Sequence, residues 1–324
     1  MGWVFAQPVR LIVGDSGVSG ATRASGTISI PLATVAGLMF ANGFCFLLTA
    51  LLLYHFTLEV FDRQDIALLA SLLWATSFYA YGWSYHPVDQ MGGLVMIFAF
   101  PWLLWRVTRK PTLAGNALLG LGMGILMLMK AYYVLPFIYV VWAILFRFDL
   151  KAVIAGFILS FIPTFLWQRA YVHITGAPFV DYQLGAGGIV GYLVQHLGNF
   201  SGLFSSLITN FINFPRIILN SAGWPIALAA LGFYITKGSQ HVRLTLLSGI
   251  WLFGFFLFLT LADFFIPRHG SDFFPFIYPA AAFVGMSLWD RMISTKARAL
   301  LILAYLLYTV LSFTLVWICV SEVL

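Results

Sequence analysis

Ten apolar runs follow one another along this chain, and each has about the length that a helix needs to cross a lipid bilayer. The runs occupy approximately residues 38–61, 66–84, 88–106, 113–130, 131–147, 151–170, 217–235, 243–266, 273–289 and 298–320. A spanning helix requires roughly 20 mostly apolar residues. The sequence therefore predicts an all-α, polytopic transmembrane helix bundle of about ten spans.

The composition excludes an ordinary soluble domain. Of the 324 residues, 61% are hydrophobic and only 9% are charged, whereas about 25% charged residues is typical of soluble domains. The spans leave room for one or two modest loops and for no separate soluble catalytic domain. Any chemistry must therefore take place at the membrane face, with membrane lipids as neighbours.

The charge and the cysteines exclude further classes of protein. The formal net charge is +6, and in a membrane protein such an excess reflects basic cytoplasmic loops rather than a nucleic-acid surface. No nucleic-acid partner is predicted. Cys45 and Cys319 both lie in apolar runs, so neither a disulfide framework nor a thiolate metal site is expected.

The stretch from 113 to 147 can be read as one overlong helix or as two. Lys130 lies near its middle, and a basic residue there favours a turn at a water-accessible edge. We therefore predict two helices that are separated near Lys130.

The basic residues predict the orientation of the chain. Eleven of the 17 lie in one set of alternate loops. They are Arg63, Arg106, Arg109, Lys110, Arg147, Lys151, Lys237, Arg243, Arg291, Lys296 and Arg298. This set is expected to be cytoplasmic, which places both termini on the external side of an inner or plasma membrane. Residues 1–27 carry no secretory signal, and an external start without one is unusual, so the chain is expected to lack an initial spanning helix.

Two external segments are expected to lie outside the spans. Residues 1–27 form a loop rich in glycine and serine, and residues 171–216 form the one long external segment. Within the second, apolar residues recur at spacings of three and four: Leu193, Leu197, Phe200, Phe204, Leu207, Phe211 and Phe214. This stripe predicts one or two amphipathic helices. They either lie in the outer interface or pack on the bundle.

Charged side chains at membrane depth are costly and usually functional. Five acids lie on the predicted external side: Asp15, Asp89, Asp181, Asp263 and Asp272. Most of the others lie at cytoplasmic helix ends beside basic residues, where solvated pairing explains them. External carboxylates and cations are what a reaction on a lipid-linked anionic substrate requires. The external histidines match no metal-ligand spacing, so no metal site is predicted, although assistance by a divalent ion stays open.

Two segments carry a family resemblance. Residues 118–130 read LLGLGMGILMLMK, in which Gly120 and Gly124 allow close helix packing and Lys130 ends the run. Residues 265–279 read FIPRHGSDFFPFIYP, with Arg268 just before a helix punctuated by prolines. Together they resemble the membrane-embedded GT-C glycosyltransferases of the aminoarabinose-transferase and protein O-mannosyltransferase type.

The resemblance covers roughly residues 28 to 290. Comparable residues of the family correspond to Ile30–Leu32, to Phe61–Arg63 followed by Ile66–Ala70, and to Ser84–Pro87 before Asp89. In that family a first helix precedes an external loop that bears the catalytic carboxylate. Here the loop corresponds to residues 1–27, and we expect the first helix to be lacking and to be supplied by a partner subunit.

The resemblance implies a single domain over residues 1–324 that takes its sugar from a polyprenyl-phosphate donor and uses no cofactor. A carboxylate must accept the proton of the acceptor hydroxyl as this attacks the anomeric carbon. Asp15 is the only acid of the N-terminal loop and is the predicted catalytic base. Lys130 and Arg268 would bind the leaving phosphate.

Four further residues are predicted to bind the substrates. His86 and Asp89 would orient the acceptor or the base, and Tyr85 and Tyr278 would line the sugar pocket. Plainer roles stay open for several of these candidates. Asp15 lies in a Gly-Asp-Ser-Gly sequence that favours a turn, and Asp89 is suited to cap a helix.

The two predicted phosphate ligands also have structural alternatives. The long side chain of Lys130 could simply extend to the membrane interface. Arg268 could form an ion pair with Asp263 or Asp272. The sequence leaves these alternatives open.

Three functions follow from the sequence. The first is an integral-membrane glycosyltransferase that acts on the external face on a glycan, lipid or protein acceptor. The second is a non-catalytic, GT-C-like scaffold or lipid-binding subunit of a membrane complex. The third, a transporter or flippase, predicts internal repeats with broken helices at the bilayer midplane, and no convincing repeat relates the two halves of the sequence.

Overall fold

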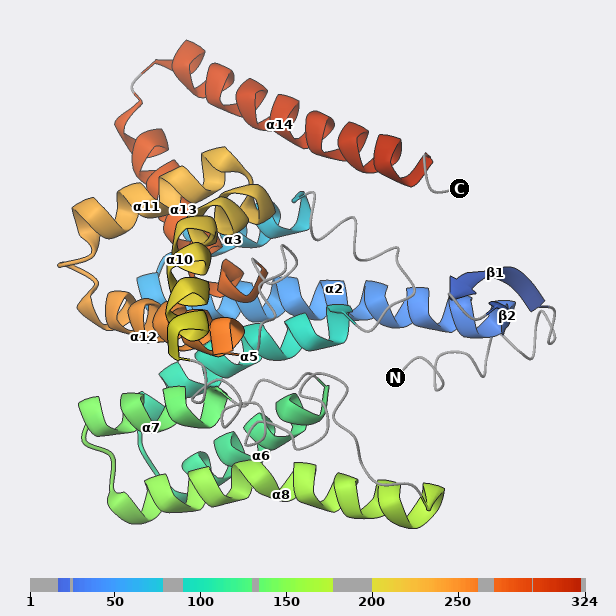
Figure 1. The fold of residues 1–324 in the computed structure, drawn as a ribbon. Coiled ribbons are helices and arrows are strands. Elements are labelled where there is room, and N and C mark those ends of the chain that lie inside the picture. Colours follow the sequence, from blue (N-terminus) through green and yellow to red (C-terminus); the bar gives the residue numbers. More distant parts are fainter. Residues whose placement is uncertain are drawn as a thin grey trace.

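The computed structural model describes residues 17–23, 26–77, 90–129, 134–176, 200–261, 271–292 and 294–321. This part of the chain forms a helix bundle preceded by a small β-hairpin (Figure 1). The elements are β1 (Gly17–Arg23), β2 (Gly26–Pro31), α2 (Leu32–Phe61), α3 (Gln64–Ala75), α5 (Gln90–Arg109), α6 (Leu113–Met129), α7 (Leu135–Leu145), α8 (Leu150–Thr175), α10 (Phe200–Ala222), α11 (Trp224–Lys237), α12 (Val242–Leu261), α13 (Phe274–Arg291) and α14 (Thr295–Ser321).

Each of the ten predicted apolar runs is helical over at least part of its length in the described chain, but the run 217–235 is not one helix, because it is divided between the end of α10 and α11 at Gly223. The break near Lys130 is confirmed, because α6 ends at Met129 and α7 begins at Leu135. In Figure 1, α6, α7 and α8 form the lower part of the bundle, α12 lies in the middle of the view, and α11 and α14 lie above it. The helical fold class is therefore confirmed for most of the described chain.

The hairpin is a difference from the sequence analysis, which expected a loop through residue 27. Strands β1 and β2 are antiparallel, with Gly17 opposite Pro31 and Arg23 opposite Gly26, and the register is irregular between Ser19 and Ala21. Val, Thr and Ile make up a large share of the two strands, and these β-branched residues favour extended backbone. Helix α2 follows β2 directly.

The number of membrane spans is not confirmed as ten. Among the described residues, two helical segments are long and apolar enough to cross a bilayer, Ala36–Phe61 and Leu150–Ile174, and the bent pair α10–α11 would make a third. Helices α3 and α7 have only 12 and 11 residues, which is about 18 Å or less at 1.5 Å per residue, against a hydrocarbon thickness of about 30 Å. Hydropathy locates the apolar runs but not the residue at which each helix stops.

The closest helix pair is α6 against α8, and glycines make this contact possible. A methyl group built on Gly124 would lie 2.6 Å from the carbonyl oxygen of Ser160 and from two ring carbons of Pro163. A methyl group on Gly120 would overlap the backbone of Gly156. The predicted close packing at Gly120 and Gly124 is therefore confirmed.

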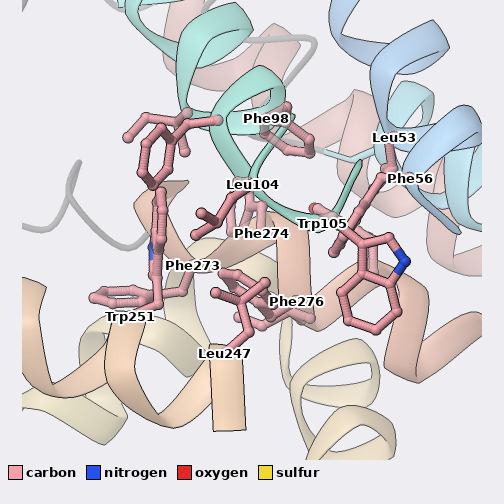
Figure 2. Packing of buried hydrophobic residues seen from close by; sticks show 14 of the residues in the cluster. Leu53, Phe56, Phe98, Leu104, Trp105, Leu247, Trp251, Phe273, Phe274 and Phe276 are labelled. Carbon is pink, nitrogen blue, oxygen red and sulfur yellow. The ribbon is translucent and has the colours of Figure 1, made fainter. Parts of the chain in front are cut away.

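Large aromatic side chains fill the centre of the bundle (Figure 2). The ring of Phe56 in α2 lies 6.1 Å from those of Trp105 in α5 and Phe276 in α13. Trp251 in α12 lies 5.5 Å from Phe276 and 5.7 Å from Phe100. These contacts join α2, α5, α12 and α13 into one core.

Helix α10 runs across its neighbours, as Figure 1 shows, and meets α11 at an angle of 117°. The turn is at Gly223, whose φ of +85° lies in the region that favours glycine. Phe214 packs on Phe256 and Phe273, whereas Phe204 and Phe211 are largely exposed. Helix α10 therefore combines both alternatives left open by the sequence, since one face packs on the bundle and another presents apolar side chains to the surroundings.

The described basic residues of the alternate loops gather at one end of the bundle, called the basic end below. Glu59 of α2 binds Arg106 of α5, and Arg63 pairs with Asp290 of α13. At the start of α12, the guanidinium of Arg243 lies over the rings of Trp105 and Phe146. The sequence predicted that alternate loops lie on the same side of the bundle. These contacts bring the corresponding helix ends together, although they are far apart in the chain.

Candidate functional site

Six of the seven predicted site residues lie outside the described residues: Asp15, Tyr85, His86, Asp89, Lys130 and Arg268. Their roles stay predictions. Four described helix ends adjoin the segments that carry them, namely the end of α3, the start of α5, the end of α6 and the start of α13. A site formed by the predicted residues would therefore lie beside these four helix ends.

Tyr278, the seventh, lies in the first half of α13 and is fully buried. Its ring is 5.1 Å from that of Phe274 and 6.0 Å from that of Trp74. Trp74 also contacts Phe98 of α5 at 5.4 Å. Tyr278 is therefore part of an aromatic cluster that joins α3, α5 and α13, and its contact with a sugar stays a prediction.

The same cluster brings together the end of α3 and the start of α13, and both carry buried polar residues. The rings of Trp74 and Phe274 are 5.9 Å apart. Ser77 follows α3, and Ser271 and Asp272 precede α13; all three are almost completely inaccessible to solvent. We call Ser77, Ser271 and Asp272 the buried polar layer.

Hydrogen bonding and packing fix the position of Asp272. The indole N–H of Trp251 donates to the backbone oxygen of Asp272 over 2.8 Å, and the ring of Phe255 lies 6.1 Å from that of the adjacent Phe273. Figure 2 shows Trp251 beside Phe273. Helix α12 thus holds the backbone of Asp272 and Phe273, just before the start of α13.

The depth of Asp272 follows from its neighbours. Trp251 is nine residues along α12 from Val242, and Phe100, which contacts it, is nine residues before the end of α5. At 1.5 Å per residue, both are about 14 Å from the helix ends at the basic end. The backbone of Asp272, which accepts the hydrogen bond of Trp251, therefore lies beside the middle of α12.

A buried carboxylate is a candidate for function, because burial of a charge is costly and acidic residues are rarely fully buried. Its oxygens can accept a proton, accept hydrogen bonds from hydroxyl groups or balance a cation. In the aromatic cluster that contacts Phe274, the indole N–H of Trp74 is buried and has no acceptor among the described residues. Unsatisfied buried donors are uncommon, so this N–H offers a hydrogen bond to a polar ligand atom.

The sequence identified Asp272 as an external acid but gave it no role beyond pairing with Arg268. The local sequence does not distinguish Asp272 from Asp263. The contacts of Asp272 and the adjacent Phe273 are made by Trp251 and Phe255 of α12, which is a different helix. Among the described residues, no group of three His, Cys, Asp or Glu side chains is arranged to hold a metal ion.

Comparison with protein-family models, with curated proteins and with solved structures finds no match to this chain. The functional argument therefore rests on the residues themselves.

Proposed function

We propose that the protein is an integral-membrane glycosyltransferase that transfers a sugar from a polyprenyl-phosphate donor to a glycan, lipid or protein acceptor. The proposal includes a topology of about ten spans in an inner or plasma membrane, with both termini external. The choice of a polyprenyl-phosphate sugar as donor rests on the motif resemblance to the GT-C glycosyltransferases. The observation that carries it is the buried Asp272, just before the start of α13, which contacts the end of α3 through Phe274 and Trp74.

The arrangement of the chain supports this proposal. The segment that carries Arg268 leads directly into Ser271 and Asp272, and the chain that leaves the end of α3 carries Tyr85, His86 and Asp89. The end of α3 and the start of α13 contact each other through Trp74 and Phe274. The chain segments next to these two helix ends carry four predicted substrate-binding residues: Tyr85, His86, Asp89 and Arg268. A carboxylate at this position is suited to orient the acceptor or the donor hydroxyl groups.

The proposed reaction balances as follows. The acceptor oxygen forms a bond to the anomeric carbon, and the bond from that carbon to the phosphate oxygen breaks with its electron pair. Polyprenyl phosphate leaves as an anion, whose charge Arg268 and Lys130 would stabilise. The acceptor proton passes to a carboxylate, for which Asp15 is the predicted base, and Asp272 would act as a positioning residue.

The test uses purified protein in lipid nanodiscs with labelled polyprenyl-phosphate sugars. Asp15→Asn and Arg268→Ala should abolish sugar transfer, because they remove the base and a phosphate ligand. Asp272→Asn should lower kcat at least tenfold, whereas Asp290→Asn, which changes an exposed carboxylate at the basic end, should keep wild-type activity. Absence of transfer and of donor hydrolysis with every polyprenyl-phosphate sugar in correctly folded wild type would contradict the proposal.

A transporter or flippase is the second candidate, and two observations favour it. Asp272 is a buried carboxylate beside the middle of α12, and α10 and α11 form a bent pair joined at Gly223; buried polar residues and broken helices occur at the substrate sites of transporters. The two candidates differ in one readout. A flippase would move the labelled lipid between leaflets without cleaving the bond between sugar and phosphate, and Asp272→Asn would slow that movement.

A further inference from the structure

A second charged cluster lies at the basic end, away from the buried polar layer. It consists of Glu59, Trp102, Arg106 and Arg109, and we call it the Glu59 cluster. The Nε of Arg106 donates to Glu59 Oε1 over 2.7 Å, and the indole N–H of Trp102 donates to the same oxygen over 2.9 Å. Arg109 donates to the backbone oxygen of Glu59, and its guanidinium lies 3.9 Å from Glu59 Oε2. Glu59 thus orients two guanidinium groups, that of Arg106 through its carboxylate and that of Arg109 through its backbone oxygen.

The Glu59 cluster has an excess of positive charge at the surface. The side chains of Arg106 and Arg109 are 57% and 50% exposed, whereas that of Glu59 is 16% exposed. Lys110 follows directly and is also exposed. The guanidinium of Arg106 stacks on Trp102 at 4.6 Å, which fixes it further. Two oriented arginines against one shielded carboxylate form a site for an anion, because arginine binds phosphate through paired N–H groups.

Other cations of the basic end are arranged differently. Arg63 faces two carboxylates, Asp65 and Asp290, so its charge is already compensated. Arg243 lies over the rings of Trp105 and Phe146. The Glu59 cluster therefore differs from these two sites in combining uncompensated charge with fixed geometry.

An exposed apolar stripe of α2 leads directly to this cluster. Phe40, Phe44, Leu47 and Leu51 are each more than half exposed, and they follow one another at spacings of four, three and four residues. The next position of the stripe is the exposed His55, and Glu59 follows four residues later. From Phe40 to Glu59 the stripe is about 28 Å long, close to the thickness of the hydrocarbon core.

We propose that the Glu59 cluster binds the phosphate of an anionic phospholipid whose acyl chains lie along the exposed stripe of α2. The apolar stripe selects a lipid over a soluble phosphate compound, because a soluble ligand would leave the stripe unused. Trp102 lies between stripe and cations, where tryptophan is favoured at a membrane interface. This proposal is independent of the proposed glycosyltransferase activity, since it concerns the opposite end of the bundle.

The primary test measures lipid binding to the purified protein in detergent by native mass spectrometry. Phosphatidylglycerol and phosphatidylcholine of equal chain length are the probes. Each basic residue near a membrane contributes about fivefold to the binding of an anionic lipid, so the double variant Arg106→Gln/Arg109→Gln should bind phosphatidylglycerol about 25-fold more weakly. The matched control, Arg291→Gln/Lys296→Gln, removes the same charge from exposed residues of the same end and should change binding less than twofold.

A second measurement uses wild-type protein and does not depend on the folding of a variant. Phosphatidylglycerol with a photoreactive group in its acyl chain should crosslink to peptides that contain residues 44–59 or 96–110. Equal losses in the double variant and the control would overturn the proposal, because they would show unspecific attraction to the basic end. Displacement of the lipid by millimolar inorganic phosphate, or crosslinks distributed over all helices, would overturn it as well.

Discussion

A methyl group at Gly124 tests the close contact between α6 and α8. In Gly124→Ala the new carbon would lie 2.6 Å from the backbone oxygen of Ser160 and from Cγ and Cδ of Pro163. Ordinary contacts of a Cβ atom begin at 3.4 Å, so α6 and α8 must separate by about 0.8 Å. Neither neighbour can yield locally, because one is helix backbone and the other is a rigid ring.

The loss of stability caused by this separation follows from two known magnitudes. A gap of 0.5–1 Å removes about a quarter to a half of the dispersion attraction of the atoms that face each other, and overpacking typically costs about 1–3 kcal/mol. We expect Gly124→Ala to lower the free energy of unfolding by this amount. Gly122 lies two residues away in the same helix, and a methyl group there meets no atom within 4 Å. Gly122→Ala should therefore be neutral or stabilise by up to about 1 kcal/mol, through helix propensity alone.

The measurement is reversible denaturation in bicelles, followed by the fluorescence of the eleven tryptophans. The difference between the two variants isolates the contact, because both exchange glycine for alanine in α6. Equal stabilities of Gly124→Ala and Gly122→Ala, within about 0.5 kcal/mol, would refute the close approach of α6 and α8 at Gly124.

Further predictions concern other parts of the bundle. The hydroxyl of Tyr139 donates to Asn116 Oδ1 over 2.7 Å, so Tyr139→Phe should lower the free energy of unfolding by about 0.6–1.7 kcal/mol, the range for such bonds in membranes; no loss in the same denaturation assay would contradict this. Burial and the nearby charge of Lys237 lower the pKa of His241, so the folded protein should lose stability as pH falls below about 6.5, where the unfolded chain takes up the proton first. Melting curves between pH 5 and 8 should show that His241→Phe removes this dependence. Asp290→Asn breaks an exposed ion pair and should cost less than about 1 kcal/mol; a larger loss would show that the pair is shielded from solvent.

Part of the site was accessible from the sequence, and part was not. An acid before a proline-containing helix at position 272 can be read directly, and so can the cations at 106 and 109. That Trp251 and Phe255 contact Asp272 and Phe273, or that Glu59 orients two arginines, cannot be read, because these contacts join residues that are 18 to 50 positions apart. The predicted base and phosphate ligands lie outside the described residues and remain to be tested by mutation.

The sequence alone determined where the helices lie, where the chain breaks near Lys130, which loops share the basic end, and that Gly120 and Gly124 allow close packing. These properties depend on local hydropathy, charge and side-chain size, which each segment carries with it. Tertiary structure alone decided that α3 stops at Ala75, that α10 turns through 117° at Gly223, and that Asp272 is fully buried. Helix length, crossing angle and burial depend on which neighbours are in contact, and a single sequence does not specify these neighbours.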